Sequence, residues 1–275
     1  MVAQTRTAGQ PSPKKLKFHD KLTTKNSTTD ALQKKLKALH AELATMDQET
    51  VDTSSLSSVR KDLINTSILL HKDRGVKAYA ACCLADLLRL YAPDAPYTRE
   101  ELRDIFSFFF RQLSTGLKGP DSPYYNEYYH LLESLSTVKS VVLVCDLPNA
   151  EELMTEIFRS FFGTVRLNLA KKIELFIADI LIALIDECQS LPAEVLESIM
   201  AQFMDQNTVS HYLMCNMFFS ERSSAWTNLP TGSPYKSALP PRTSCSGMSA
   251  STSLTSSSST RGTKISSKCK QHTTS

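Results

Sequence analysis

The stretch 73–98 constrains the fold more than any other part of the sequence. Apolar residues recur at helical spacing over 76–91, which predicts one amphipathic helix. Two prolines within 92–96 end that helix and form a rigid corner. Thr98 followed by Glu101 matches a capping box, so a second helix is predicted to begin there. The stretch is therefore a helical hairpin, which must stack on a neighbour to bury its apolar face.

The same hairpin pattern recurs along the chain. Further helices are predicted at 124–137, 148–162, 169–188 and 192–204, with a short helical piece at 138–145. Equivalent positions lie 47 and 46 residues apart in the first helices, and 52 and 42 residues apart in the second helices. HEAT and armadillo units run about 40–47 residues. The equivalent apolar residues of the first helices are Leu84, Leu131 and Ile177, each followed two positions later by an acid: Asp86, Glu133 and Asp179.

These repeats predict an all-α, HEAT/armadillo-like helical-hairpin solenoid with disordered termini. Two more helices are expected ahead of the first hairpin, at 29–43 and 54–64. We expect a disordered basic tail over 1–27, helical repeats over 28–204, and a disordered Ser/Thr-rich tail over 205–275. Only four glycines fall within the central part, as helices require.

The charge is divided unevenly along the chain. Residues 1–25 and 205–275 each carry a net charge of +5, whereas 26–204 carry −7. An acidic body argues against a globular surface that grips DNA. The basic flanks, including Lys14 to Lys25, leave a nonspecific nucleic-acid contact open as an alternative.

No catalytic or metal-binding pattern stands out, so catalytic, cofactor-binding and metal residues are predicted to be none, and no cofactor is expected. His40, His71 and His130 are far apart in sequence and none has a His or Cys partner at metal-ligand spacing. Cys82 and Cys83 lie in an apolar run and are expected to pack in the core of a reduced intracellular protein.

Two acidic residues, Asp186 and Glu187, end an apolar helix and superficially suggest a catalytic carboxylate pair. Adjacent positions on a helix point about 100° apart, so these side chains do not converge on one substrate atom. The sequence also lacks a phosphate-binding loop and a nucleophile elbow. We therefore expect a protein that is not an enzyme.

Two aromatic features are candidates for partner contact. Tyr125, Tyr128 and Tyr129 share a helix face, which favours a place in the core between repeats, with a partner-binding ridge as the alternative. The corner Ala-Pro-Asp-Ala-Pro at 92–96, beside Tyr91 and Tyr97, is the best site candidate. It suits docking of a short peptide, and a simple turn between helices is the alternative.

Five strings are longer and less generic than a HEAT pattern requires: KAYAACCLADLLRLYAPDAPY at 77–97, DSPYYNEYY at 121–129, LLESL at 131–135, SVVLVCDLP at 140–148 and LIDEC at 184–188. On these strings, residues 30–203 resemble the N-terminal region of the "precocious dissociation of sisters" family of cohesin-associated regulators of sister chromatid cohesion.

The resemblance implies a nuclear, chromatin-associated HEAT-repeat scaffold without enzymatic activity. It implies binding to the kleisin subunit of cohesin and to peptides of the cohesin-release factor and its antagonist. The peptide-binding role transfers to the family motif at Ala92, Pro93, Asp94, Ala95 and Pro96, with Tyr91 and Tyr97 flanking it. It places the kleisin-contacting residues of the family further along the solenoid.

The resemblance stops near Met204, and family members are several times longer. A truncated gene model, and hence a non-functional fragment, is one explanation. A general helical-repeat adaptor is the other alternative to a cohesin regulator, and binding of a release-factor peptide at 92–96 distinguishes the two.

Overall fold

The computed structural model describes residues 13–23, 28–165, 169–188 and 190–204. The chain divides into two compact units, 1–239 and 240–275, and the second lies wholly outside the described residues. Within the described residues the regular structure is helical, apart from a single β-bridge between Lys14 and Val51. The predicted all-α class is confirmed.

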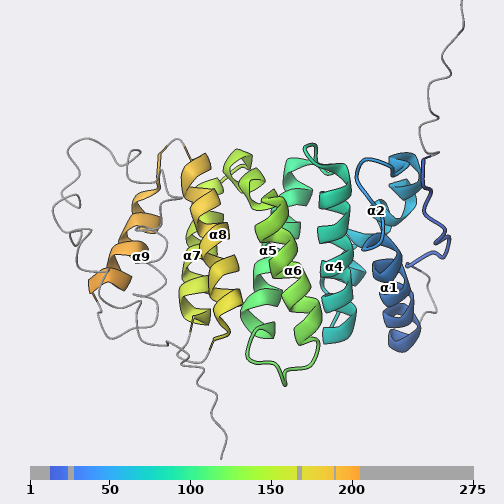
Figure 1. Ribbon diagram of the computed structural model, residues 1–275, viewed down its shortest axis with the longest axis horizontal. Coiled ribbons are helices and arrows are strands. Elements are labelled where there is room, and N and C mark those ends of the chain that lie inside the picture. Colours follow the sequence, from blue (N-terminus) through green and yellow to red (C-terminus); the bar gives the residue numbers. More distant parts are fainter. Residues whose placement is uncertain (1–12, 24–27, 166–168, 189, 205–275) are drawn as a thin grey trace, which may run out of the picture. The chain divides into compact units, whose positions relative to one another are not determined.

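The helices stack in two layers (Figure 1). One layer contains α1 (Thr29–Leu43), α4 (Arg74–Tyr91), α6 (Tyr125–Val138) and α8 (Lys171–Glu187), each packed against the next. The other contains α5 (Arg99–Gly116), α7 (Ala150–Thr164) and α9 (Ala193–Met204), also packed in sequence order. The repeating helix pairs predicted from the sequence therefore exist, and they form a helical-hairpin solenoid.

Shorter helices fill the remaining positions. The 3₁₀-helix η2 (Ser140–Asp146) contacts α5, α6, α7 and α8. Near the amino-terminal end, η1 (Thr53–Leu56) and α2 (Ser57–Leu63) correspond to the helix predicted at 54–64. The single-turn helix α3 (Thr66–Leu69) was not predicted, because four residues carry too little periodicity to be recognised.

Side-chain caps begin three of the long helices. Thr28 and Asp73 accept hydrogen bonds from the backbone amides of Ala31 and Val76, at the starts of α1 and α4. The capping box at the start of α5 is confirmed, since the Thr98 and Glu101 side chains each accept a bond from the other residue's amide. These caps satisfy amides that have no partner within the helix.

Aromatic side chains join the second-layer helices. The rings of Phe110 on α5 and Phe161 on α7 meet edge to face, with centroids 5.4 Å apart. Such pairs add to the free energy gained by burying apolar area. Where α5 ends, the ring of Tyr128 lies so close to Gly116 that a Cβ there would come within 2.2 Å of it. Only glycine leaves room for this ring.

The amino-terminal segment differs from the expectation. Residues 13–23 were predicted to be disordered with the rest of 1–27, yet Leu16 and Leu22 are buried. Their amides donate to Ser55 Oγ and Asp62 Oδ2, each at 3.0 Å. Two isolated leucines are thus enough to anchor this basic segment to the helices. They have no helical periodicity, so the sequence did not reveal this role.

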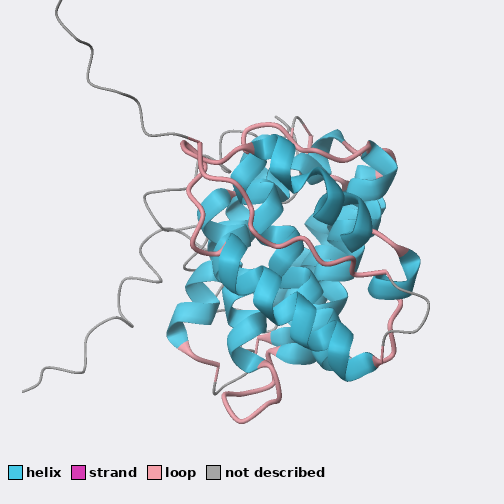
Figure 2. Ribbon diagram, turned by 90° about the vertical axis from the view of Figure 1, so that its right-hand side faces the viewer, coloured by secondary structure: helices cyan, strands magenta, loops and turns pink. Residues whose placement is uncertain are grey.

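The extended segment is the dark-blue trace in Figure 1, and the view from the α1 end in Figure 2 shows the helices joined by loops. Residues 1–12, 24–27 and 205–275 lie outside the described residues, so the disorder predicted for them stays a prediction. Of the helices that the structure describes, none is long and apolar enough to cross a membrane.

Candidate functional site

The predicted docking corner lies where α4 ends and α5 begins. Tyr91 is the last residue of α4, and Thr98 caps α5. Between them the Ala92–Pro93 peptide bond is cis, and the chain reverses direction within six residues. The corner thus projects from one end of a helical hairpin, where a partner can reach it.

Side chains from neighbouring segments hold the corner in place. The carbonyl of Ala92 accepts a hydrogen bond from Gln48 Nε2, and the carbonyl of Pro96 accepts one from Arg60 on α2. The two prolines of the corner donate no backbone hydrogen bond, so its carbonyls have few local partners. The structure instead uses them to fasten the corner to the segments that precede α4.

The two flanking tyrosines also face inward. Tyr91 donates from its hydroxyl to the carbonyl of Thr53 at 2.9 Å. Tyr97 is buried, and its hydroxyl finds no hydrogen-bond partner in the described structure. Burial raises the pKa of Tyr97, although the Arg60 guanidinium, 5.9 Å from the ring centroid, opposes the rise. Neither tyrosine ring is part of the exposed surface of the corner, because Tyr91 is half-buried and Tyr97 is buried.

The exposed part of the corner is therefore small. Pro93 and Asp94 are exposed, while Ala92, Ala95 and Pro96 are half-buried. A proline ring and one carboxylate on a fixed backbone form a compact contact surface, suited to a few residues of a peptide. The assignment of Ala92–Pro96, Tyr91 and Tyr97 as a peptide site remains a prediction.

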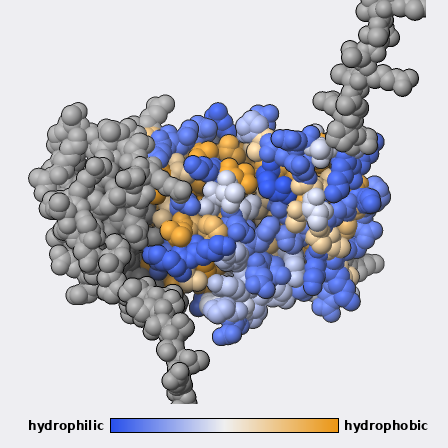
Figure 3. Space-filling view, in the orientation of Figure 1, coloured by the Kyte–Doolittle hydropathy of each residue, from blue (hydrophilic) through white to orange (hydrophobic). Residues whose placement is uncertain are grey.

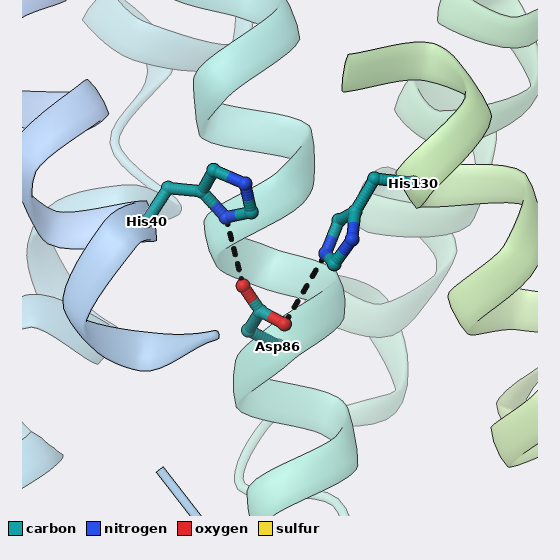
Figure 4. A group of neighbouring side chains, drawn as sticks. All are labelled: His40, Asp86 and His130. Atoms are coloured by element: carbon teal, nitrogen blue, oxygen red, sulfur yellow. Dashed lines mark hydrogen bonds and ion pairs between the residues drawn. The ribbon is translucent and has the colours of Figure 1, made fainter. Parts of the chain in front are cut away.

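A second site lies inside the first layer, and sequence reasoning missed it. Asp86 on α4 is buried between His40 on α1 and His130 on α6 (Figure 4). His40 Nδ1 lies 2.9 Å from Asp86 Oδ2, and His130 Nε2 lies 3.3 Å from Oδ1. Two histidines that looked isolated in sequence thus meet at one carboxylate.

A cation completes this cluster. Arg89, one turn further along α4, places a guanidinium nitrogen 3.5 Å from Asp86 Oδ1. The same guanidinium donates to the carbonyls of Leu43 and Met46, each at 3.0 Å, at the end of α1. Arg89 therefore caps the end of α1 and also pairs with the Asp86 carboxylate, which links α1 to α4.

The balance of forces on Asp86 favours its charged form. Burial alone would raise the pKa of this carboxyl group, but the hydrogen bonds and charges of His130 and His40 outweigh burial and lower it. The sequence held one clue: Asp86 occupies the acidic position that recurs in each first helix. Nothing in the sequence showed which of the three acids would meet histidines.

The tyrosine cluster is divided by the fold. Tyr128 is buried in the core, as expected. Tyr125 and Tyr129 are half-buried, and the Tyr129 ring packs against Phe176 on α8, with centroids 5.7 Å apart and Lys172 above both rings. On the face drawn in Figure 3, hydrophobic residues gather towards the α8 side.

The four cysteines of the described residues form two pairs, one buried and one half-buried. Cys82 and Cys83 are buried, and burial raises the pKa of both thiols, which agrees with the predicted core packing. Cys145 on η2 and Cys188 at the end of α8 lie together, with their sulfurs 3.7 Å apart. Their distance in sequence hid this second pair.

The stacked hairpins define the class of protein: a helical-repeat scaffold of the HEAT type. The model of the family described as "Sister chromatid cohesion protein PDS5 protein" matches residues 30–220. The match spans all the helices from α1 to α9 and well over half of the sequence. This chain belongs to that family, which confirms the resemblance seen in the sequence. The expected end of the resemblance near Met204 was wrong, because the match continues to residue 220.

Curated relatives agree. The chain is similar to sister chromatid cohesion protein pds5 of Schizosaccharomyces pombe, with 45% identity over 64% of this chain and 15% of the relative. It is 38% identical to sister chromatid cohesion protein PDS5 of Saccharomyces cerevisiae over 70% of this chain and 15% of the relative. The human relative, PDS5 homolog A, is 35% identical over 64% of this chain and 13% of the relative.

A solved structure gives the same answer for the fold. A chain in the structure of the Pds5–Scc1 complex, described with implications for cohesin function, superposes with a TM-score of 0.69. It is 33% identical, and the match covers 76% of this chain and 33% of that chain. The chain thus spans about 15% of the length of the curated relatives named first.

Proposed function

We propose that this protein is a non-enzymatic scaffold that regulates cohesin on chromatin and supports mitotic sister chromatid cohesion. The observation that carries the proposal is the family match over residues 30–220, which covers every stacked helix of the described structure. The similar chain in the Pds5–Scc1 complex supports binding to Scc1, the kleisin of cohesin. A nuclear, chromatin-bound location follows from this role.

The corner at 92–96 is the proposed docking point for short aromatic peptides of the cohesin-release factor and its antagonist. Three features of the corner support this role: its fixed backbone, its exposed Pro93 and Asp94, and its position at a hairpin end. A rigid site loses little conformational entropy when it binds a peptide. Nucleic acid, if contacted, is contacted through the basic flanks.

The test is fluorescence anisotropy with the full chain and a labelled aromatic peptide taken from the release factor. Asp94→Lys reverses the exposed charge of the corner without removing a buried group. We expect binding by the wild-type chain and a loss of at least about tenfold in affinity, roughly 1.4 kcal/mol, in the variant.

A matched control is Asp121→Lys, which makes the same charge change at another exposed loop aspartate, between α5 and α6. It should bind as the wild type does. Equal losses in the two variants would indicate a general charge effect and not a site. No binding by a folded wild-type chain would favour the general helical-repeat adaptor.

A further inference from the structure

The cluster of His40, Asp86 and His130 joins three successive helices of one layer. One ligand atom from each residue lies within 4.8 Å of the other two. No other group of three such side chains in the described residues meets this arrangement. Neither the family match nor the proposed docking role of the corner accounts for it.

We propose that His40, Asp86 and His130 bind one divalent transition-metal ion, with Zn²⁺ as the best fit. Two imidazole nitrogens and one carboxylate oxygen are a ligand set that zinc proteins use, with water in the fourth position. Mg²⁺ and Ca²⁺ prefer sites made of oxygen atoms, so the two nitrogens select against them.

The distances require only a small adjustment. Ligand atoms of a tetrahedral zinc site stand about 3.3 Å apart, given zinc–ligand bonds of about 2.0–2.1 Å. The contacts of 2.9 and 3.3 Å run from the two histidines to different oxygens of Asp86, so the carboxylate must turn to present one of them to both histidines. The histidine rings, with centroids 4.7 Å apart, need to turn towards each other. Each then presents a lone pair and carries its proton on the other ring nitrogen.

A metal ion can reach this cluster from solvent, and a neighbouring residue orients one of its ligands. The His40 and His130 side chains are 18% and 32% exposed, whereas Asp86 is 1% exposed, so one side of the cluster is open to solvent and an incoming ion. Arg89 lies 3.5 Å from Asp86 Oδ1 and orients the carboxylate, as partners beyond the ligands do in metal sites. Its positive charge offsets that of Asp86, so the nitrogen ligands must supply most of the affinity.

The test uses the full chain, first stripped of metal with a chelator and then titrated with Zn²⁺ by calorimetry. We expect one equivalent of zinc to bind, and Co²⁺ to give the visible absorption of a tetrahedral nitrogen and oxygen site. His130→Gln should lower the zinc affinity by more than about tenfold. Asp86→Asn should abolish the one-equivalent step.

The matched control is His71→Gln. His71 is a half-buried histidine outside the cluster, and its Nδ1 accepts a bond from the Asp73 amide. This variant should bind zinc as the wild type does. Circular dichroism without metal confirms that each variant is folded, and His130→Gln keeps the test valid if Asp86→Asn unfolds.

Three outcomes would overturn the proposal. The first is a folded wild-type chain that takes up no zinc. The second is zinc binding that survives in folded His130→Gln and Asp86→Asn variants. The third is a sulfur-to-cobalt charge-transfer band, which would show that cysteine thiolates hold the metal instead of the histidines.

Discussion

The α1–α4–α6 interface and the α6–α8 interface use the same repeat position in different ways. Asp86 and Asp179 are equivalent residues of the first-layer helices. Asp86 is buried and meets two histidines and Arg89, whereas Asp179 is half-buried and accepts one bond, from Ser136 Oγ at 3.3 Å. A repeat thus fixes where an acid stands, and its neighbours decide what that acid does.

The other side-chain contacts of these two interfaces also differ. Between α4 and its neighbours, polar side chains reach backbone carbonyls: Arg89 bonds to the end of α1, and Cys82 Sγ contacts the carbonyl of Glu127 on α6 at 3.2 Å. Between α6 and α8, the rings of Tyr129 and Phe176 pack together beneath Lys172. The first interface thus adds several polar contacts to its apolar packing, whereas the second adds one hydrogen bond, between Ser136 and Asp179.

The largest expected effect comes from removing the buried acid. Asp86→Ala leaves two histidines and an arginine without their common partner, and should lower the free energy of unfolding by about 3 kcal/mol. Asp179→Ala removes one hydrogen bond and should cost about 1 kcal/mol or less. Urea unfolding of both variants, followed by circular dichroism, measures the difference. Equal costs would remove the distinction between the two interfaces.

Two glycines of the second layer extend the comparison to packing, because one faces a first-layer ring and the other faces open space. Gly116→Ala drives a methyl group into the Tyr128 ring and should cost about 2 kcal/mol. Gly163, near the end of α7, has no atom within 4 Å of the same added carbon. Gly163→Ala should therefore stabilise by about 0.5 kcal/mol, because alanine restricts the unfolded chain. Thermal melting points should move in opposite directions. A rise in both melting points would show that Tyr128 yields to the methyl group, and a fall in both would contradict the open space at Gly163.

Acid gives the smallest of the three effects. The folded-state pKa of Asp86 lies below its ordinary value, so its contribution to stability is present above about pH 4 and is lost as the pH falls through the folded-state pKa. The stability difference between wild type and Asp86→Asn, measured in chelator, should shrink over this range. A difference that grows with acid would mean that burial, and not the histidines, controls this carboxyl group.

Much of the fold could be predicted because helices leave a periodic signal. The prediction at 29–43 matches α1 residue for residue, and the hairpin helices end within two residues of their predicted limits. The capping box at Thr98 is local, so four residues suffice to reveal it. Repeat spacing then supplied the stacking order, since each hairpin must cover the last.

The sites depended on contacts that no local pattern carries. His40 and His130 lie 46 and 44 residues from Asp86 in sequence, and only the stacking of three helices brings them together. At the corner, the sequence revealed the prolines but not Gln48 and Arg60, which occupy the carbonyls. Leu16 and Leu22 likewise gave no sign of docking until their partners were in place.

Asp86 also has a mechanical consequence. In a stack of repeats, each unit usually contacts only its immediate neighbours, so each interface can open or bend independently of the others. A single carboxylate shared by α1, α4 and α6 couples two joints, because opening either one strips Asp86 of a partner. The segment from α1 to α6 should therefore move as one rigid body, and elastic bending of the array should begin beyond α6.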